Sequence, residues 1–182
     1  MLELQFNPFP VIATERLLLR AVEATDLDAL YELRTNNDVM LHLNKPRQSK
    51  EDVAKMIEHI QNDHQNNDAI TWGISKKDNV RLMGTIGFWR IDKAHYRAEI
   101  GYMLHPDHRR KGYLNEAISA TMQYGFDQIK LHSVEGHVNP ANVASIGLLQ
   151  KQGFVKEAYF RENYHFNGVF LDTAIYCKVR SD

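Results

Sequence analysis

The sequence predicts an α/β protein in which about four helices pack on one mixed β-sheet of six or seven strands. Apolar residues alternate in some segments, as in strands, and recur at helical spacing in others. A strand, a helix and a second strand follow one another over residues 96–138, which predicts a right-handed crossover between parallel strands. The sheet is therefore expected to be mostly antiparallel, and parallel only around this crossover.

Two helices are expected before most of the strands. Residues 24–36 form the first, with Thr25 and Asp28 in a capping-box relation. The second starts near Ser49, with Asp52 three residues later. Its apolar face has i, i+3, i+4, i+7 spacing and comprises Val53, Met56, Ile57 and Ile60.

Seven segments have the pattern of strands. They are residues 16–22, 69–77, 81–92, 96–106, 131–138, 155–164 and 169–180. The pair Asp78-Asn79 is expected to turn the chain between the second and third of these. Asn167-Gly168 is a strong hairpin signal between the last two, and Pro106 ends the fourth.

Two further helices lie between the later strands. The helix over residues 112–126 is expected to present Leu114, Ile118, Thr121 and Gly125 on one face. A short helix within residues 139–154 carries Val143, Ile146 and Leu149 at every third position. Gly153 is placed to stop that helix, and Phe154 is the apolar residue that often follows such a stop.

The composition bounds the class of protein. The chain has 182 residues, which fits one domain over residues 1–182, with 43% hydrophobic and 25% charged residues. The net charge of −1 gives no general attraction to nucleic acid or anionic lipid, so neither is expected as a partner. No apolar run approaches the roughly 20 residues that span a bilayer, and the first residues lack a signal-peptide pattern, so a cytoplasmic protein is expected. With Cys177 as its one cysteine, the chain forms no internal disulfide.

Several enzyme classes lack their motifs in this chain. There is no GxxxxGK[ST] loop, no GxGxxG after the first strand and no GxSxG, which argues against nucleotide kinases, dinucleotide enzymes and serine hydrolases. The nine histidines form neither HExxH nor a cysteine and histidine grid, so no metal site is expected.

The stretch HPDHRRKGYLNEA, residues 105–117, places three cations where a helix begins. The helix dipole disfavours positive charge at that end, but the free amides there favour an anion. A bound phosphate would satisfy both the amides and the cations, and Gly112 would permit its close approach. The alternative interpretation is a solvated basic turn.

The order and spacing of three segments identify a family resemblance. HRRKGYLNEA opens the main helix, NPANVASIGLLQKQGF follows the next strand, and LDTAIYCKV closes the chain. Together they resemble the GNAT superfamily of acetyl-CoA-dependent N-acetyltransferases over residues 14–179. The AEIGYML strand, the NxxS helix start and the GF after that helix look most like the ribosomal-protein N-terminal (Rim-type) branch. The resemblance implies a GNAT sheet splayed at its central parallel pair, acetyl-CoA as co-substrate and an amine as acceptor.

The resemblance also assigns residues to the cofactor. The pyrophosphate turn of the family maps onto Arg109, Arg110, Lys111, Gly112, Tyr113 and Leu114, of which Leu114 departs from the family's small residue. The backbone of Tyr102, Met103 and Leu104 is implicated in pairing with the pantetheine arm, and Asn139 and Asn142 lie across the splay. For both asparagines the alternative is turn and helix-capping chemistry.

The expected reaction is direct attack of an amine on the acetyl thioester. Ser145 matches the family position near the sulfur and is the candidate acid or hydrogen-bond donor; alternatively, it merely occupies the first turn of a helix. Glu99 is the candidate base; alternatively, it forms a structural ion pair, since Arg97 shares its strand face. An α-amino group, with a pKa of about 7.7–8.0, needs a weaker base than lysine, with a pKa of about 10.4.

The expected acceptor is a protein N-terminus, of the ribosomal-protein-alanine type. The alternatives are a small amine (a polyamine, an antibiotic or an amino acid) and a non-catalytic CoA-binding module. The oligomeric state stays open, with a homodimer among the options.

Overall fold

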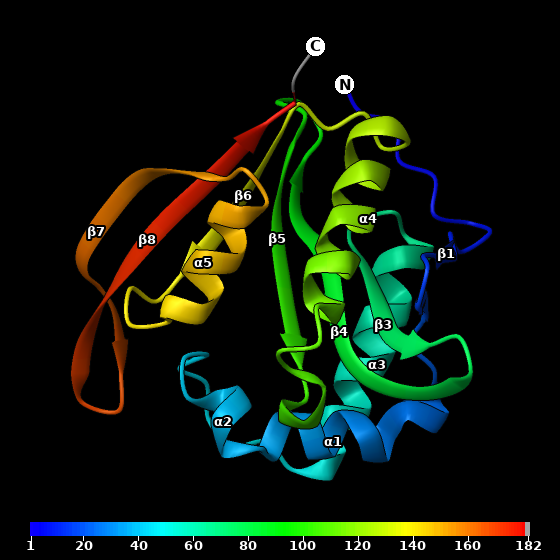
Figure 1. Ribbon diagram of the computed structural model, residues 1–182, viewed down its shortest axis with the longest axis horizontal. Helices are drawn as coiled ribbons and strands as arrows, with labels where there is room; N and C mark the ends of the chain where they lie inside the picture. Colours follow the sequence, from blue (N-terminus) through cyan, green and yellow to red (C-terminus); the bar gives the residue numbers. More distant parts are fainter. Residues whose placement is uncertain (181–182) are drawn as a thin grey trace.

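An eight-stranded sheet runs through the computed structural model, which describes residues 1–180, in the order β1-β2-β3-β4-β5-β6-β8-β7 (Figure 1). The strands are β1 (Ile12–Ala13), β2 (Leu17–Ala21), β3 (Ile70–Lys76), β4 (Asn79–Asp92), β5 (Arg97–Leu104), β6 (Ser133–Val138), β7 (Val155–Phe166) and β8 (Val169–Val179). Neighbouring strands are antiparallel except β5 and β6. This confirms the predicted fold class. The additional strand, β1, has two residues and is defined by its pairing with β2.

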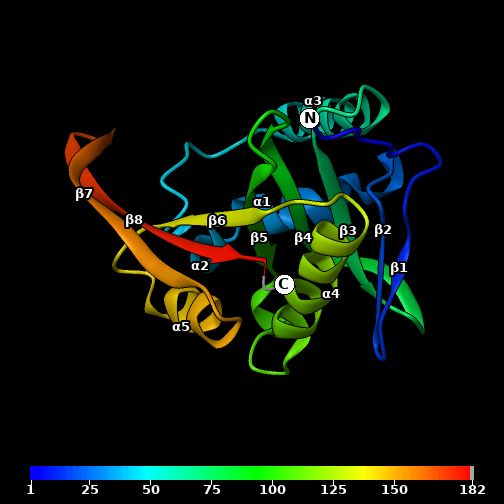
Figure 2. The ribbon, with the colours of Figure 1, turned by 90° about the horizontal axis from the view of Figure 1, so that it is seen from above.

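Helices cover both faces of this sheet. They are α1 (Leu27–Thr35), α2 (Asn37–Met40), α3 (Lys50–Gln65), α4 (Tyr113–Asp127) and α5 (Val143–Lys151), with the 3-10 turns η1 (Ala24–Asp26) and η2 (Pro106–His108). Figure 2 shows α3 on one side of the sheet and α4 and α5 on the other. The α1 and α3 helices share one apolar cluster, whereas α4 and α5 contribute to the larger one. Within residues 1–180, no helix is long and apolar enough to cross a membrane.

The helix caps test the local predictions. At α3, Ser49 Oγ accepts a hydrogen bond from the Asp52 amide at 3.1 Å, and the Ser49 amide donates to the Asp52 carboxylate at 2.9 Å, so this capping box is confirmed. The box predicted at Thr25 and Asp28 is wrong. It lies two residues earlier, between Glu23 and Asp26.

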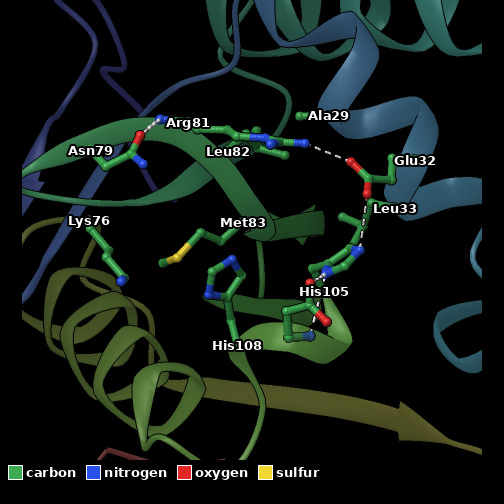
Figure 3. Close-up of a pocket in the computed structure, with 11 residues that line it drawn as sticks. Ala29, Glu32, Leu33, Lys76, Asn79, Arg81, Leu82, Met83, His105 and His108 are labelled. Carbon is green, nitrogen blue, oxygen red and sulfur yellow. Dashed lines mark hydrogen bonds and ion pairs between the residues drawn. The ribbon is translucent and has the colours of Figure 1, made fainter.

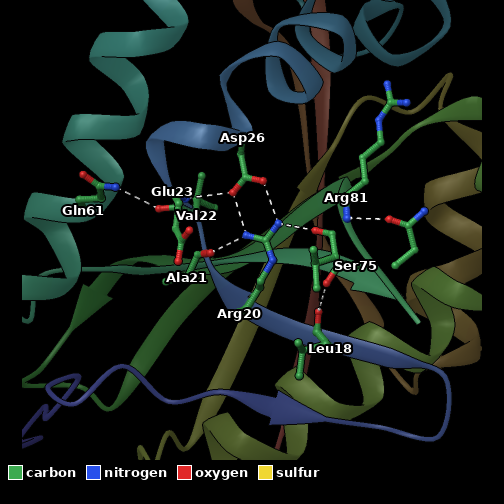
Figure 4. A network of polar contacts seen from close by, with 11 residues as sticks. Leu18, Arg20, Ala21, Val22, Glu23, Asp26, Gln61, Ser75 and Arg81 are labelled. Atoms are coloured by element: carbon green, nitrogen blue, oxygen red, sulfur yellow. Dashed lines mark hydrogen bonds and ion pairs between the residues drawn. The ribbon is translucent and has the colours of Figure 1, made fainter. Parts of the chain in front are cut away.

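The carboxylate of Asp26 explains this shift, because it is fixed by β2. The Arg20 guanidinium donates to both of its oxygens at 2.7 Å and also reaches the Val80 carbonyl at 2.6 Å (Figure 4). The hydrogen bonds with Asp26 raise the pKa of Arg20 despite its partial burial. The network ties β2, the start of α1 and β4 together, and so sets where α1 lies against the sheet.

The turns follow the sequence closely. Asn167 and Gly168 have φ of 48° and 81°, which both central residues of a type I′ hairpin turn require. Gly153 has φ of 83°, and the following Phe154 amide donates back to the Leu149 carbonyl at 3.0 Å, so the predicted stop of α5 is confirmed. The first hairpin turns one residue earlier than predicted, because Asn79 already pairs with Lys76.

Two helical faces differ in part from the pattern. In α4, Ile118, Thr121 and Gly125 are buried as predicted. Leu114 is partly buried at the edge of the larger cluster. In α5, Leu149 is buried, but Val143 is 74% exposed because it is the first residue of the helix.

The sheet opens between its two parallel strands. Pairs form at Arg97 with Ser133, Ala98 with Val134 and Glu99 with Glu135, and pairing stops there. Residues 100–104 of β5 therefore have no strand partner on that side in the described part of the chain. The predicted splay is confirmed, and we call the space beyond the Glu99–Glu135 pair the opening.

Candidate active site

The turn that leads from β5 into α4 has the shape of an anion cradle. Arg110 and Gly112 both have positive φ, of 60° and 79°, and Gly112 is the residue before the first turn of α4. A Cβ at Gly112 would meet the Arg16 guanidinium at 3.2 Å, and no other described atom is within 4 Å. The first amides of α4, at Tyr113 and Leu114, precede its helical hydrogen bonds. These residues fit a phosphate group that approaches the backbone closely.

The three cations of the turn are exposed. Lys111 Nζ donates to the Asp107 carbonyl at 2.8 Å, and the Arg109 guanidinium donates to the Asp38 carbonyl at 3.2 Å. Neither cation is neutralised by these contacts, since a carbonyl carries no net charge. Burial lowers the pKa of the neighbouring His108, with Lys111 and Lys76 adding to the effect, so His108 adds no charge at neutral pH.

A residue from the N-terminal segment holds this turn in place. The Arg16 guanidinium donates to the Lys111 carbonyl at 2.9 Å and pairs with the Glu116 carboxylate at 2.7 Å, and it lies 4.7 Å from the centre of the Tyr113 ring. Burial raises the pKa of Glu116, but hydrogen bonds from Thr14 and Arg16 together outweigh burial and lower it. Sequence reasoning missed this anchor because its partners are 100 residues apart and leave no local pattern.

Across the opening, two hydroxyl groups meet. Tyr102 Oη on β5 and Ser145 Oγ on α5 are 2.9 Å apart. Burial raises the pKa of Tyr102 to about 12, although the hydrogen bond with Ser145 opposes this. The phenol therefore stays protonated at neutral pH and can donate a hydrogen bond. The sequence indicated Ser145, but it assigned Tyr102 through its backbone alone.

Both asparagines hold local backbone amides, Asn142 as a helix cap and Asn139 in a turn. Asn142 Oδ1 accepts from the Ser145 amide at 3.1 Å and caps α5, and Asn139 Oδ1 accepts from the Ala141 amide at 2.9 Å. The cap fixes Ser145 in the first turn of α5, as one interpretation of the sequence had it. Among residues 1–180, neither side-chain NH₂ group makes a hydrogen bond, so both can still donate to a ligand.

The functional side chains fall on opposite faces of the sheet. A Cβ at Gly136 would touch Leu149 of α5 and Ile100, which places Gly136 and Ile100 on the α5 face. By strand alternation Tyr102 shares that face, whereas Glu99 on β5 and His137 on β6 lie on the other. We call this other side the acceptor face.

On the acceptor face, two carboxylates sit side by side at the last parallel pair. Glu99 accepts from the Arg90 guanidinium at 2.8 Å, and its side chain is 12% exposed. Glu135 pairs with Arg97 and lies 3.1 Å from His137 Nε2. Glu99 thus forms an ion pair, as the alternative interpretation expected, but with Arg90 and not with its strand neighbour Arg97. The partner was hidden because Arg90 is in an irregular part of β4, with φ of 49°.

The long β7–β8 hairpin borders the acceptor face and projects from the rest of the molecule (Figure 2). Tyr164 Oη donates to the Asn44 carbonyl at 2.8 Å, which joins the hairpin to the segment between α2 and α3. The next residue is Lys45, whose pKa is lowered overall. Partial desolvation is the main cause, Arg34 and Arg90 add to it, and Glu99 opposes it. The segment between α2 and α3 therefore lies beside Glu99.

A separate cavity of about 300 Å³ lies at the far end of β5 (Figure 3). Its walls come from α1, the β3–β4 hairpin and η2, and His105 and His108 face it (Figure 3). In one wall, Glu32 is bound by Arg81 at 2.8 Å and lies 3.5 Å from His105. This cavity borders the turn but not the opening, and we do not include it in the site.

Comparison with known proteins agrees with this geometry. A family profile described as acetyltransferase (GNAT) domain matches residues 16–155. The chain is 36% identical over 173 residues to the uncharacterized N-acetyltransferase YoaA of Bacillus subtilis, covering 94% of this chain and 98% of that protein.

Two further relatives have named substrates. The ribosomal-protein-serine acetyltransferase of Escherichia coli is 29% identical over 170 residues, or 91% of this chain and 94% of that protein. The spermidine N(1)-acetyltransferase of Vibrio cholerae is 27% identical over 158 residues, or 86% and 89%.

Solved structures show the same fold. RimL, a ribosomal L7/L12 α-N-protein acetyltransferase in complex with coenzyme A, superposes with a TM-score of 0.85 at 22% identity, covering 93% of this chain and 98% of RimL. The acetyltransferase MccE, in complex with acetyl-CoA and AMP, has a TM-score of 0.80 at 25% identity and coverages of 92% and 94%. The chain belongs to the GNAT family and is an acetyl-CoA-dependent N-acetyltransferase.

Proposed function

We propose that the acceptor of this N-acetyltransferase is the α-amino group of a protein N-terminus, of the ribosomal-protein-alanine type. The proposal is supported by the relationship to the ribosomal-protein-serine acetyltransferase. It is carried by one observation, the charge balance of the acceptor face.

The two carboxylates at the last parallel pair each already have an arginine partner, Arg90 for Glu99 and Arg97 for Glu135. Lys45 adds a further positive charge nearby. A polyamine, with several ammonium groups, would gain little attraction from such a surface. A peptide N-terminus carries one ammonium and needs one hydrogen-bond acceptor. The charge balance therefore favours a singly charged amine over spermidine, despite the spermidine N(1)-acetyltransferase among the relatives.

The geometry of the turn and the opening supports the cofactor roles that we propose. Arg109, Arg110 and Lys111 with the amides of Gly112, Tyr113 and Leu114 would hold the pyrophosphate. The unpaired edge of β5, at Tyr102, Met103 and Leu104, offers backbone groups to the pantetheine amides. The carboxamide NH₂ groups of Asn139 and Asn142 would donate to the cofactor arm from the α5 side. Bound acetyl-CoA supplies a thioester. Its leaving group is a thiolate whose conjugate thiol has a pKa of about 8.5, so it departs readily enough.

The protein's own groups divide the chemistry between the two faces. Glu99 accepts a hydrogen bond from the incoming ammonium and acts as base, directly or through water. Ser145, held by the Asn142 cap and by Tyr102, donates a hydrogen bond on the α5 face. Tyr102 keeps its proton at neutral pH and so orients the Ser145 hydroxyl.

Thiol release from acetyl-CoA with a panel of acceptors tests the proposal. The panel contains peptides that begin with alanine or serine, the same peptides with blocked N-termini and an internal lysine, and spermidine. We expect kcat/KM to be highest for the free N-termini and to vanish on blocking. A higher kcat/KM for spermidine, or equal rates with blocked peptides, would overturn the acceptor assignment.

A further inference from the structure

The low exposure of Glu99 raises the question of where the amine's proton goes. The amine enters the reaction as an ammonium and ends as an amide, so two protons must leave its nitrogen. One ends on the sulfur of the departing thiol, and the other must reach water. Glu99 is 12% exposed and already accepts from Arg90, so it has little contact with solvent to which it could pass that proton.

His137 lies where such an exit is needed. Strands β5 and β6 last pair at Glu99 and Glu135, and His137 is the next residue of β6 on the acceptor face. It therefore stands at the edge of the opening, one residue pair beyond Glu99. Its side chain is 27% exposed, so its ring can exchange a proton with solvent.

The hydrogen bonds of His137 prepare it to accept a proton. Its Nε2 lies 3.1 Å from Glu135 Oε1, and the other oxygen of Glu135 is held by Arg97. A carboxylate accepts from an N–H group, so this contact selects the tautomer protonated at Nε2 and leaves Nδ1 as the acceptor. Within residues 1–180, Nδ1 has no hydrogen-bond partner. Glu135 also stabilises the imidazolium once the proton has been taken up.

We propose that His137, oriented by Glu135, is the group that carries the acceptor's proton from the active site to solvent. The ammonium proton passes to His137 Nδ1, through Glu99 or a water molecule, and the neutral nitrogen forms its bond to the acetyl carbon as the carbon–sulfur bond breaks. The nitrogen then loses its second proton, and the departing thiolate takes up a proton to become the thiol of coenzyme A. His137 returns to neutral by releasing its proton to water. This inference needs the acetyl transfer of the family and does not depend on which amine is the acceptor.

Other charged groups surround His137. Among the described residues, the charged and titratable groups on this face include Glu135 on β6, Arg97 and Glu99 on β5, Arg90 on β4, Glu157 on β7, Cys177 on β8 and Lys45 before α3. Burial raises the pKa of Cys177, and Glu157 and Glu135 add to the effect, so the thiol keeps its proton near neutral pH.

The pH dependence of kcat tests the proposal, with the best amine of the acceptor panel at saturation. The wild-type profile should rise with an apparent pKa in the imidazole range, reporting the enzyme–substrate complex. In His137→Gln that limb should disappear and kcat at pH 8 should fall by roughly 100-fold, the lower end of general-base effects. His132→Gln, at an exposed histidine one residue before β6, is the matched control and should keep the wild-type profile.

Glu135→Gln separates proton transfer from a structural role. Loss of the carboxylate removes the partner that stabilises imidazolium, so the limb should move to lower pH while activity persists. NMR titration of the His137 ring in the free protein should show the same downward shift in Glu135→Gln, and calorimetry should give acetyl-CoA affinities within about twofold of wild type in both variants. A wild-type profile in His137→Gln, or an unmoved ring titration in Glu135→Gln, would overturn the proposal. Failure of the N-terminal acceptor assignment would appear separately, in the choice of amine.

Discussion

Gly112 offers the sharpest test of the acetyl-CoA turn, because a single methyl group changes both strain and access there. Its φ of 79° lies in the left-handed region, which costs an ordinary residue about 1–2 kcal/mol. The Arg16 guanidinium, 3.2 Å from a built Cβ, is the mobile end of a side chain and can move aside. We therefore expect Gly112→Ala to lower the free energy of unfolding by about 1–2 kcal/mol. For a chain of this size that is a fall in Tm of roughly 2–8 °C.

Gly112→Ala should weaken acetyl-CoA binding as well as lower stability. The Cβ would occupy the space through which a phosphate approaches the amides of α4, so we expect at least a tenfold rise in the Kd for acetyl-CoA, or about 1.4 kcal/mol. Gly112→Asn distinguishes the two effects, since asparagine tolerates the left-handed region better than alanine. Its Tm should lie closer to wild type, while its Kd should stay raised because its Cβ is in the same place.

Gly147→Ala is the matched control. This glycine is inside α5, and no described atom is within 4 Å of its built Cβ, so alanine should raise stability by about 1 kcal/mol. Thermal unfolding and calorimetry with acetyl-CoA measure both quantities in all three variants. Wild-type affinity in Gly112→Ala would show that phosphate does not approach this turn, and an unchanged Tm would refute the strain argument.

Three further outcomes follow from the site. Ser145→Ala and Tyr102→Phe should each lower kcat, while the Kd for acetyl-CoA stays near wild type. The loss in log kcat of the double variant should be smaller than the sum of the two single losses, because the two hydroxyls share one hydrogen bond. Additive losses in single-turnover kinetics would contradict this coupling. Glu99→Gln should lower kcat without abolishing the imidazole limb of the pH profile, whereas a profile that loses its limb would make Glu99 the titrating base. The lowered pKa of Glu116 means that its contribution to stability is complete above its unfolded pKa and is lost as the pH falls through the folded value. Glu116→Gln should therefore flatten the acid side of a plot of Tm against pH. Parallel acid limbs in the variant and the wild type would show that the pair with Arg16 contributes nothing.

Local signals in the sequence carried much of this structure. The hairpin at Asn167-Gly168, the stop at Gly153 and the cap at Ser49 each depend on backbone preferences of one or two residues, and all three are present. The capping box expected at Thr25 is absent. The Asp26 carboxylate forms the box with Glu23 instead, and it is held there by hydrogen bonds from Arg20, a tertiary contact that no local pattern predicts.

The site divides in the same way. Gly112 and Ser145 could be located because each stands at a helix start with a recognisable pattern. The Tyr102 hydroxyl, the Arg90 partner of Glu99 and the dyad of Glu135 with His137 could not, since each depends on how two strands or a strand and a helix are spaced. Alternation along a strand gives the face on which a side chain lies, but the neighbour that it meets there is set by register between segments far apart in the chain.

The contact of Arg16 with the turn also bears on how the protein matures during synthesis. Arg16 leaves the ribosome long before Lys111 and Glu116. Arg16 therefore cannot form these contacts until about one hundred further residues have been made. A nascent chain can form the β3–β4 hairpin and pair it with β2 while its cofactor turn is still without its clamp. The clamp on the cofactor turn therefore forms only after residues 111–116 have been made. Acetyl-CoA, as a ligand of the native state, would stabilise only chains in which this contact has formed, because a ligand shifts the folding equilibrium toward the state that it binds.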